Sequence, residues 1–269
     1  MTEGQALAHR AHQSDWIDHA ARIGLLAYGL VHVVIGWLAL QLALGDPSGS
    51  ASSTGAIREL AEQPFGLVLV WLVAVGMFLL MCWRILEAAL GHRDDDGFKR
   101  VRKRLTSAGR AGVYGLISLS ALSIALGSGS SGGGTDSTTA KLMDLTGGQL
   151  IVAAIGVAIA AIGVALIRKA WTEEFAKEMD VEGLTGASGT AYRWLGKVGC
   201  VAKGLAFGIV GALFCYAAAT HEPNKSGGLD QALSEVLEQP FGPFLLAVIA
   251  LGFAAYGLFC FAQARYFDR

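Results

Sequence analysis

The pentapeptide EQPFG at residues 62–66 occurs again, letter for letter, at residues 238–242. Each copy follows a segment that resembles a short amphipathic helix and stands directly before a long apolar stretch. The matching place in the middle of the chain holds a weaker echo, DLTGG, at residues 144–148. A pattern that recurs in this way indicates one supersecondary unit copied along the chain. We therefore interpret the chain as three tandem units.

A second set of matches gives the same repeat length. Tyr-Gly-Leu at 28–30 matches Tyr-Gly-Leu at 114–116 and Lys-Gly-Leu at 203–205. The first and third copies lie 175 residues apart, which agrees to within one residue with the 176 residues between the two EQPFG copies. Each unit of this length holds two of the six long apolar stretches of the chain. If each stretch crosses a membrane, two crossings return the chain to the side where it started, so all three units have the same orientation. The expected arrangement is three tandem helical hairpins with pseudo-threefold symmetry about the membrane normal, a form of parallel repeat.

Composition supports a membrane protein. Hydrophobic residues make up 53% of the 269 residues and charged residues only 16%, against about 45–50% and about 25% in soluble domains. Six apolar stretches approach the roughly 20 residues that a spanning helix needs, and no alternating strand pattern competes with them. The predicted fold is an all-α, six-span polytopic membrane protein. The predicted spans are about 23–44, 66–86, 110–127, 149–168, 198–219 and 242–264.

The basic residues predict the topology. Seventeen of the 21 Lys and Arg residues fall on one side of the six spans, three fall on the other, and Lys203 lies inside the fifth span. Such a split predicts that both termini are cytoplasmic. The net charge of −1 gives no basic excess for a nucleic-acid partner. The expected organisation is a cytoplasmic amphipathic N-terminus at 1–22, followed by repeats at 23–97, 98–180 and 181–269.

The same residues resemble a known family. The segments that carry the likeness are Arg22-Ile23-Gly24, Tyr28-Gly29 through Gly36, Ala202-Lys203-Gly204 through Gly211, and the two Gln-Pro-Phe-Gly turns. They look like the bacterial membrane family catalogued as domain of unknown function 1206, whose members have three tandem two-span repeats. The resemblance implies a multi-pass protein of the bacterial cytoplasmic (plasma) membrane. It does not point to any particular biochemical activity.

Polar residues inside the spans are the best functional candidates, because burying them in lipid is costly. His32 lies about ten residues into the first span, about 14 Å from its end at 1.5 Å per residue, and Tyr28 shares its helical face. Two readings stay open for each basic group: Lys203 extends to the interface or faces inward, and His32 is packed against a neighbouring helix or binds a ligand. If the odd spans surround the axis, the polar cluster there contains Tyr28, His32, Tyr114, Ser118 and Lys203.

Small residues and basic residues suggest two further contacts. Small side chains let helices approach closely, either within one chain or between two copies of it, and the candidates are Gly29, Gly115, Gly156, Gly163, Gly204 and Gly208. A basic stretch next to the third span could bind anionic lipid head groups or serve only to fix topology. Its residues are Lys99, Arg100, Arg102, Lys103 and Arg104.

The sequence contains no phosphate-binding loop, metalloprotease motif, nucleophile elbow or haem-attachment motif. We therefore expect no enzymatic activity, no catalytic residues, no metal site and no cofactor. The first expectation is an accessory or structural membrane component that acts by helix association in the bilayer, with a membrane-protein partner or a second copy. The alternative is a channel or carrier for a small solute or ion, built on the polar cluster. A cavity that reaches the cluster would favour the alternative, and a Lys203 that faces the cytoplasm would oppose it.

Overall fold

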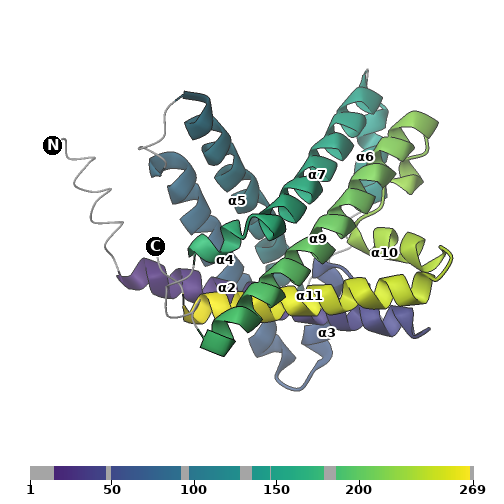
Figure 1. Ribbon diagram of the computed structural model, residues 1–269. Coiled ribbons are helices and arrows are strands. Elements are labelled where there is room, and N and C mark those ends of the chain that lie inside the picture. Colours follow the sequence, from purple (N-terminus) through teal and green to yellow (C-terminus); the bar gives the residue numbers. More distant parts are fainter. Residues whose placement is uncertain are drawn as a thin grey trace.

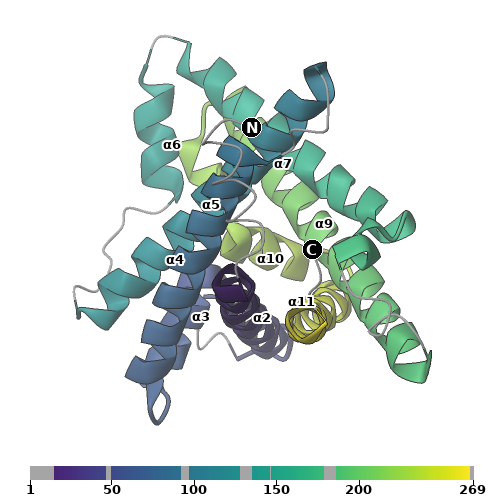
Figure 2. The same ribbon diagram turned by 90° about the vertical axis from the view of Figure 1, so that its left-hand side faces the viewer.

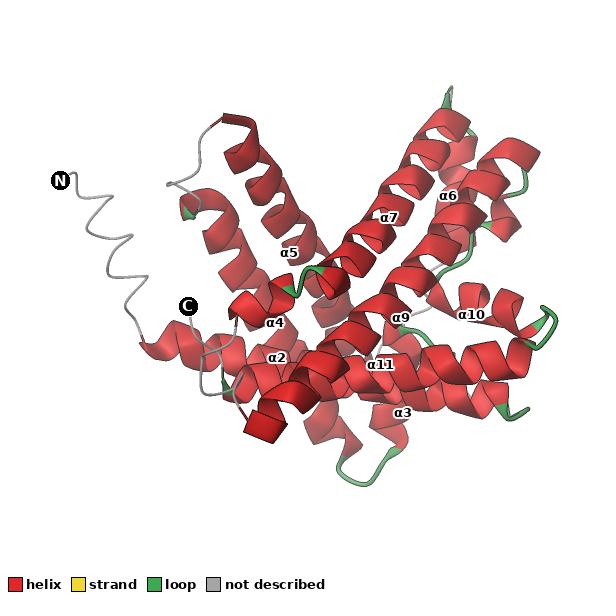
Figure 3. Cartoon of the chain, viewed as in Figure 1, coloured by secondary structure: helices red, strands yellow, loops and turns green. Residues whose placement is uncertain are grey.

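The structure, a computed structural model, describes residues 15–46, 50–91, 97–127, 135–145, 147–178 and 186–266. Over these ranges the chain is helical and contains no strand (Figure 3). Six helices are long and apolar enough to cross a membrane, so the prediction of an all-helical chain with six candidate spans is confirmed. The long helices are α2 (Asp15–Ala43), α4 (Gly66–Leu90), α5 (Gly97–Ala125), α7 (Gly148–Trp171), α9 (Gly186–Thr220) and α11 (Gly242–Arg265). The short elements are α3 (Ser53–Glu62), η1 (Glu174–Glu178), α6 (Thr135–Met143), η2 (Pro223–Lys225) and α10 (Leu229–Leu237).

Two helices extend well beyond the predicted spans. α5 begins at Gly97 and α9 at Gly186, each about three turns before the apolar stretch starts. Hydropathy marks only the apolar part of a helix, whereas Lys and Arg are good helix formers and continue α5 through the basic stretch. Of the predicted N-terminal segment 1–22, only residues 15–22 are described, as the first turns of α2; the rest lies outside the described residues.

The even spans of the three repeats begin with the same backbone turn. The residue before α4, α7 and α11 is left-handed, with φ of 63°, 78° and 61° at Phe65, Gly147 and Phe241. The next residue is glycine each time. A Cβ there would lie 2.3, 1.8 or 2.0 Å from a carbonyl oxygen of the preceding short helix or its end, at Gly66, Gly148 and Gly242 respectively. No side chain fits at such a distance. The weak middle echo DLTGG therefore folds like EQPFG because it keeps the final glycine.

The closest helix pairs join different repeats. α4 packs on α5, α7 on α9, and α11 on α2, and Figures 1 and 2 show the first two pairs tilted to either side of the third. Glycines permit this approach: a Cβ at Gly163 would lie 2.6 Å from the carbonyl oxygen of Gly204, and one at Gly29 would lie 2.8 Å from that of Gly257. The two spans of one repeat also pack together in the first and third repeats. In the middle repeat, α5 and α7 form no comparable interface over their described lengths.

The bundle has two different ends. We call the end that holds the start of α2 and the end of α11 the cavity end, and the end that holds α3, α6 and α10 the turn end. α3 and α10 are amphipathic, and they bury Ile57, Leu60, Leu233 and Val236 against the spans. Together with side chains such as Val31, Ile35 and Leu38 of α2, they form the main apolar core, and a smaller apolar cluster packs α6 against α7 and α9 at the same end. The polar groups of the spans are left for the other end.

Candidate functional site

Lys203 is buried in the centre of the bundle. Its side chain is 7% exposed, and its Nζ lies 2.5 Å from Tyr28 Oη and 2.9 Å from His32 Nε2. The ammonium also lies over the rings of Tyr28 and Tyr256, 4.6 and 4.3 Å from their centroids, where the negative faces of the rings attract a cation. Lys203 therefore points across from α9 to α2 and does not extend to the end of its own helix.

The hydrogen bonds of His32 assign its tautomer. Nδ1 lies 2.8 Å from the backbone carbonyl oxygen of Tyr28. Because a carbonyl oxygen only accepts, Nδ1 carries the hydrogen and donates it. Nε2 then presents a lone pair, which accepts a hydrogen bond from the Lys203 ammonium. The arrangement is a buried cation held by neutral groups, with the imidazole fixed in one orientation.

The other two predicted members of the polar cluster, Tyr114 and Ser118, make no hydrogen bond to Lys203. The Tyr114 ring meets the Tyr28 ring edge-on, with centroids 5.2 Å apart. Ser118 donates from its hydroxyl to the carbonyl oxygen of Ala74, at 2.9 Å, so it joins α5 to α4 and does not bond to Lys203. The structure thus gathers Tyr28, His32 and Lys203 in direct contact, places Tyr114 beside them, and gives Ser118 a packing contact.

Tyr256 and Phe253 belong to the cluster and are missing from the sequence-based set. Tyr256 lies 4.9 Å from His32 between ring centroids, and Phe253 stacks on the same imidazole at 6.1 Å. Both come from α11, an even span, whereas the sequence argument compared only the odd spans. An alignment of the even spans could have found Tyr256. Counted from the helix start, it aligns with Leu80 of α4 and Ile162 of α7, so it places a polar group where the other two repeats have an apolar one.

A cavity of about 730 Å³ opens beside Lys203. It is lined by residues from all six long helices, drawn from the first half of α2, the first two-thirds of α5, the last halves of α4, α7 and α11, and the middle of α9. Aligned positions of the three repeats meet in its wall, because Tyr28, Tyr114 and Lys203 all line it. Most of the wall is apolar, and a pocket of this size suits a small organic molecule.

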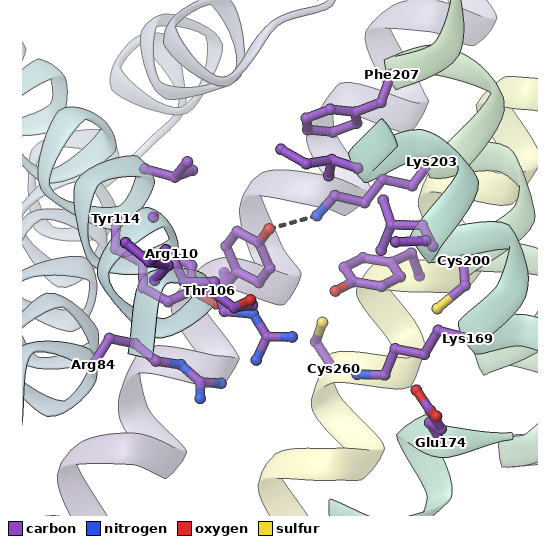
Figure 4. Close-up of a pocket in the computed structure, with 18 of the residues that line it drawn as sticks. Arg84, Thr106, Arg110, Tyr114, Lys169, Glu174, Cys200, Lys203, Phe207 and Cys260 are labelled. Atoms are coloured by element: carbon purple, nitrogen blue, oxygen red, sulfur yellow. Dashed lines mark hydrogen bonds between the residues drawn. The ribbon is translucent and has the colours of Figure 1, made fainter. Parts of the chain in front are cut away.

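The charges on the cavity wall are mainly positive. Five basic side chains line the cavity, against a single carboxylate, that of Glu174. Figure 4 shows the basic groups coming from opposite walls, with Arg84 and Arg110 from α4 and α5 and Lys169 and Lys203 from α7 and α9. The full basic set is Arg84, Arg102, Arg110, Lys169 and Lys203.

One of these charges is neutralised within the protein. Arg84 Nη1 lies 2.6 Å from Glu87 Oε2, and the same carboxylate oxygen accepts a hydrogen bond from Ser107 at 3.0 Å. Arg110, by contrast, forms no hydrogen bond or ion pair with any described residue. Arg110 and Lys203 lie on opposite sides of the cavity, and together they make it attractive to an anion.

An ion pair braces the rim of the cavity end. Glu173 lies between α7 and η1, and its carboxylate is 2.7 Å from Lys197 Nζ and 3.8 Å from Arg193 Nη1, both on α9. The hydrogen bond from Lys197 lowers the pKa of the Glu173 carboxyl below its ordinary value. This pair links the end of α7 to the start of α9 beside the cavity.

The predicted packing glycines lie at helix crossings between repeats. Gly156, Gly163 and Gly204 lie in the α7–α9 interface, and Gly208 meets Gly163 there through its backbone. Gly29 faces α11, and a Cβ at Gly115 would lie 3.0 Å from Met81 Sδ of α4. Each contact is within one chain, which is one of the two alternatives that the sequence left open.

The predicted lipid-binding residues lie on the first two turns of α5. Lys99 and Arg102 are exposed, and the other three, Arg100, Lys103 and Arg104, are half-buried. Arg104 donates a long hydrogen bond of 3.5 Å to the carbonyl oxygen of Gly91, which holds the start of α5 to the end of α4. Arg102 also lines the cavity.

Comparison with known proteins agrees with the repeat architecture. Residues 23–91, 105–173 and 198–266 each match the family described as Domain of Unknown Function (DUF1206), and each matched segment covers most of two of the six spans. A relative described as Uncharacterized protein YxxB, from Bacillus subtilis (strain 168), is 27% identical over 255 residues, which cover 93% of this chain and 91% of the relative. No solved structure matches the chain.

Proposed function

The chain belongs to the Domain of Unknown Function (DUF1206) family. We propose that it is a membrane carrier that binds a small organic anion in its central cavity. Lys203 supplies the fixed positive charge of the site, and Arg110 supplies a second charge from the opposite wall. This proposal takes up the alternative from the sequence, a channel or carrier for a small solute or ion, and specifies that the solute is negatively charged.

The observation that carries the proposal is the surroundings of Lys203. Its described contacts are all neutral: a phenol oxygen, an imidazole nitrogen and two aromatic rings. A buried charge costs several kcal/mol unless an opposite charge compensates it. The cavity beside it leaves room for the missing negative charge, and an anion bound there would complete the site.

The closed turn end favours a carrier over a channel. Beyond the level of His32 the bundle is filled by fully buried side chains such as Ile35, Leu38 and Leu246. Passage through this region requires a rearrangement of helices, as in alternating access. In the predicted topology, the described state is open towards the cytoplasm.

An accessory or structural role remains an expectation from the sequence. Helix association alone does not require a buried, uncompensated cation beside a cavity, and such groups in membrane proteins commonly mark a path for substrates or ions. The geometry therefore supports the binding role better.

The test uses benzenesulfonate, which stays anionic at all working pH values, and methyl phenyl sulfone, which has nearly the same shape without the charge. In nanodiscs, benzenesulfonate should raise the unfolding midpoint of the wild-type protein, whereas the sulfone should not. Lys203→Met should weaken this effect at least tenfold in concentration, because a hydrogen bond to a charged group contributes about 1.5–3 kcal/mol. Lys141→Gln, at an exposed position on α6, is the matched control and should behave as wild type.

Carriage is tested separately from binding. Liposomes that contain the protein and are preloaded with benzenesulfonate should accumulate the radiolabelled anion from outside by exchange. Equal stabilisation by the anion and the sulfone, or an unchanged response in Lys203→Met, would refute the proposed site. Binding without exchange would refute carriage.

A further inference from the structure

The bundle is open on one side, at the middle repeat. Going around the bundle, α11 packs on α2, α2 on α4, α4 on α5, α7 on α9, and α9 on α11. The remaining neighbours, α5 and α7, share no such interface over their described lengths. Figure 1 shows the α4–α5 pair and the α7–α9 pair diverging from each other above the α2–α11 pair. The ring of helices therefore has a lateral gap between α5 and α7.

The cavity meets this gap. Val113 of α5 and Ile162 of α7 both line the cavity, yet they are 46% and 50% exposed. Val101 and Leu105 of α5 show the same combination. Val113 and Ile162 lie in the apolar stretches of helices long enough to span the membrane, whereas Val101 and Leu105 lie in the basic stretch of α5. The gap is thus an apolar slot that connects the cavity to the acyl-chain region of the bilayer.

The charges lie in the cavity that this slot opens into. Arg110 precedes Val113 by one turn of α5, and Lys203 reaches the same cavity from α9. An occupant that satisfies both surfaces has a negatively charged part between Arg110 and Lys203 and an apolar part that leaves between Val113 and Ile162. A free aqueous anion would satisfy the charges and leave the slot without a partner.

We infer that the anion is the head group of a membrane lipid, which enters the cavity sideways between α5 and α7 while its acyl chains remain in the bilayer. This inference rests on the proposed function and names its substrate class. The lipid carries a small head with phosphate or carboxylate oxygens, since the cavity is the size of a small organic molecule and its wall presents several donors.

The slot can be tested by photo-crosslinking in nanodiscs that contain mainly phosphatidylcholine and a minor fraction of phosphatidylglycerol. p-Benzoylphenylalanine replaces Ile162 in one variant and Val164 in another. Val164 lies on the same helix, is 66% exposed and does not line the cavity, so it reports the bulk bilayer. Crosslinked lipids are identified by mass spectrometry.

We expect the Ile162 probe to capture phosphatidylglycerol about fivefold above its share of the bilayer, the enrichment that roughly one basic residue near a membrane surface provides. The Val164 probe should capture lipids in their bulk ratio. Arg110→Gln should remove most of the enrichment at position 162, and Lys141→Gln should leave it unchanged.

Bulk lipid ratios at both probes would overturn the inference. If benzenesulfonate still stabilises the protein in that case, the site binds aqueous anions and the proposed function stands without lateral entry. If that response is also absent, both proposals fall. With the probe at position 162 in native membranes, a crosslink to a polypeptide in place of lipid would overturn the lipid inference and assign the slot to a partner helix.

Discussion

The turn end and the cavity end of this bundle treat the three repeats differently. At the turn end the repeats are alike: α4, α7 and α11 each begin with a left-handed residue and a glycine in close contact with the preceding short helix. At the cavity end, aligned positions hold different side chains. They are Tyr28, Tyr114 and Lys203 on the odd spans, and Arg84, Leu166 and Cys260 on the even spans. The repeats stay alike where the backbone must fold the same way, and they differ where side chains face the cavity.

The turn end should be the more sensitive of the two to a minimal change. Gly148→Ala places a methyl group 1.8 Å from the carbonyl oxygen of Leu142, and the backbone must move to admit it. We expect a loss of at least about 3 kcal/mol of stability, the upper part of the range for overpacking. The unfolding midpoint in detergent, together with the yield of folded protein, measures this effect.

The control is the preceding residue. Gly147 has φ of 78° and nothing within 4 Å of a Cβ, and the equivalent residues of the other repeats are Phe65 and Phe241. Gly147→Phe should therefore cost only about 1–2 kcal/mol, the penalty for a left-handed L-residue. If both variants were equally stable, the close contact at Gly148 would not be what preserves the turn.

The cavity end can be tested with the same substitution at two aligned positions. Tyr28→Phe removes the oxygen that accepts from Lys203 and keeps the ring over the ammonium. We expect it to cost about 1.5–3 kcal/mol of stability, the range for a hydrogen bond to a charged group. Tyr114→Phe should change stability by less than about 0.5 kcal/mol, because the Tyr114 hydroxyl has no hydrogen bond within the described structure.

A double variant separates the loss of this bond from a general packing defect. In a Lys203→Met background the charge is absent, so Tyr28→Phe should become nearly neutral, and the difference measures the coupling between the two residues. An equal cost in both backgrounds would show that Tyr28 and Lys203 act independently. Thermal unfolding of the four proteins in one detergent completes the cycle.

A substitution between the two ends of the bundle, at the contact of α5 with α4, should have a smaller effect on stability. Ser118→Ala removes the hydrogen bond to the carbonyl oxygen of Ala74, and hydrogen bonds between membrane helices average about 0.6 kcal/mol. Ser120→Ala, two residues further along α5, removes a hydroxyl that makes no hydrogen bond to a described residue, and it should be neutral. A loss at Ser118 as large as that of Tyr28→Phe would place Ser118 in the ligand site after all.

The sequence predicted the architecture well because the signals of architecture are local. The six spans follow from runs of apolar residues, and the three repeats follow from EQPFG and its echo. Hydropathy marks only the apolar part of α5, because a helix of basic residues gives no apolar signal. The inward direction of Lys203 could not be decided, since a lysine about six residues from the end of its predicted span reaches either the interface or the core. Contact with α2, more than 170 residues away, decides it.

The open side of the ring was also beyond the reach of the sequence. The α5–α7 pair is connected like the α2–α4 and α9–α11 pairs, and neither α5 nor α7 contains a proline that would keep the two helices apart. Whether two spans touch depends on how each packs on its other neighbours, and α4 and α9 hold α5 and α7 at different tilts (Figure 1). The threefold relation and the cytoplasmic position of the termini stay predictions from the repeat and the charges.

The smallest expected effect comes from the rim of the cavity end, and it depends on pH. The hydrogen bond from Lys197 lowers the pKa of Glu173 in the folded protein, so this pair stabilises the fold above the ordinary glutamate pKa of about 4.3. The stabilisation is lost as the pH falls through the lowered folded-state pKa. Because the pair is partly exposed to solvent, Glu173→Gln should lower the unfolding midpoint by only about 1–2 °C near pH 7.

The difference between wild type and Glu173→Gln should vanish at low pH, and also in about 1 M salt, where the screening length falls to about 3 Å. Glu174→Gln is the neighbouring control, because the Glu174 carboxylate forms no ion pair with a described residue. If the difference in unfolding midpoint between wild type and Glu173→Gln persisted at low pH, the Glu173 side chain would stabilise the protein through packing and not through its charge. If it vanishes as expected, Glu173 acts through its ion pair with Lys197 and Arg193, and this link between α7 and α9 is weaker than the close glycine contacts of the turn end.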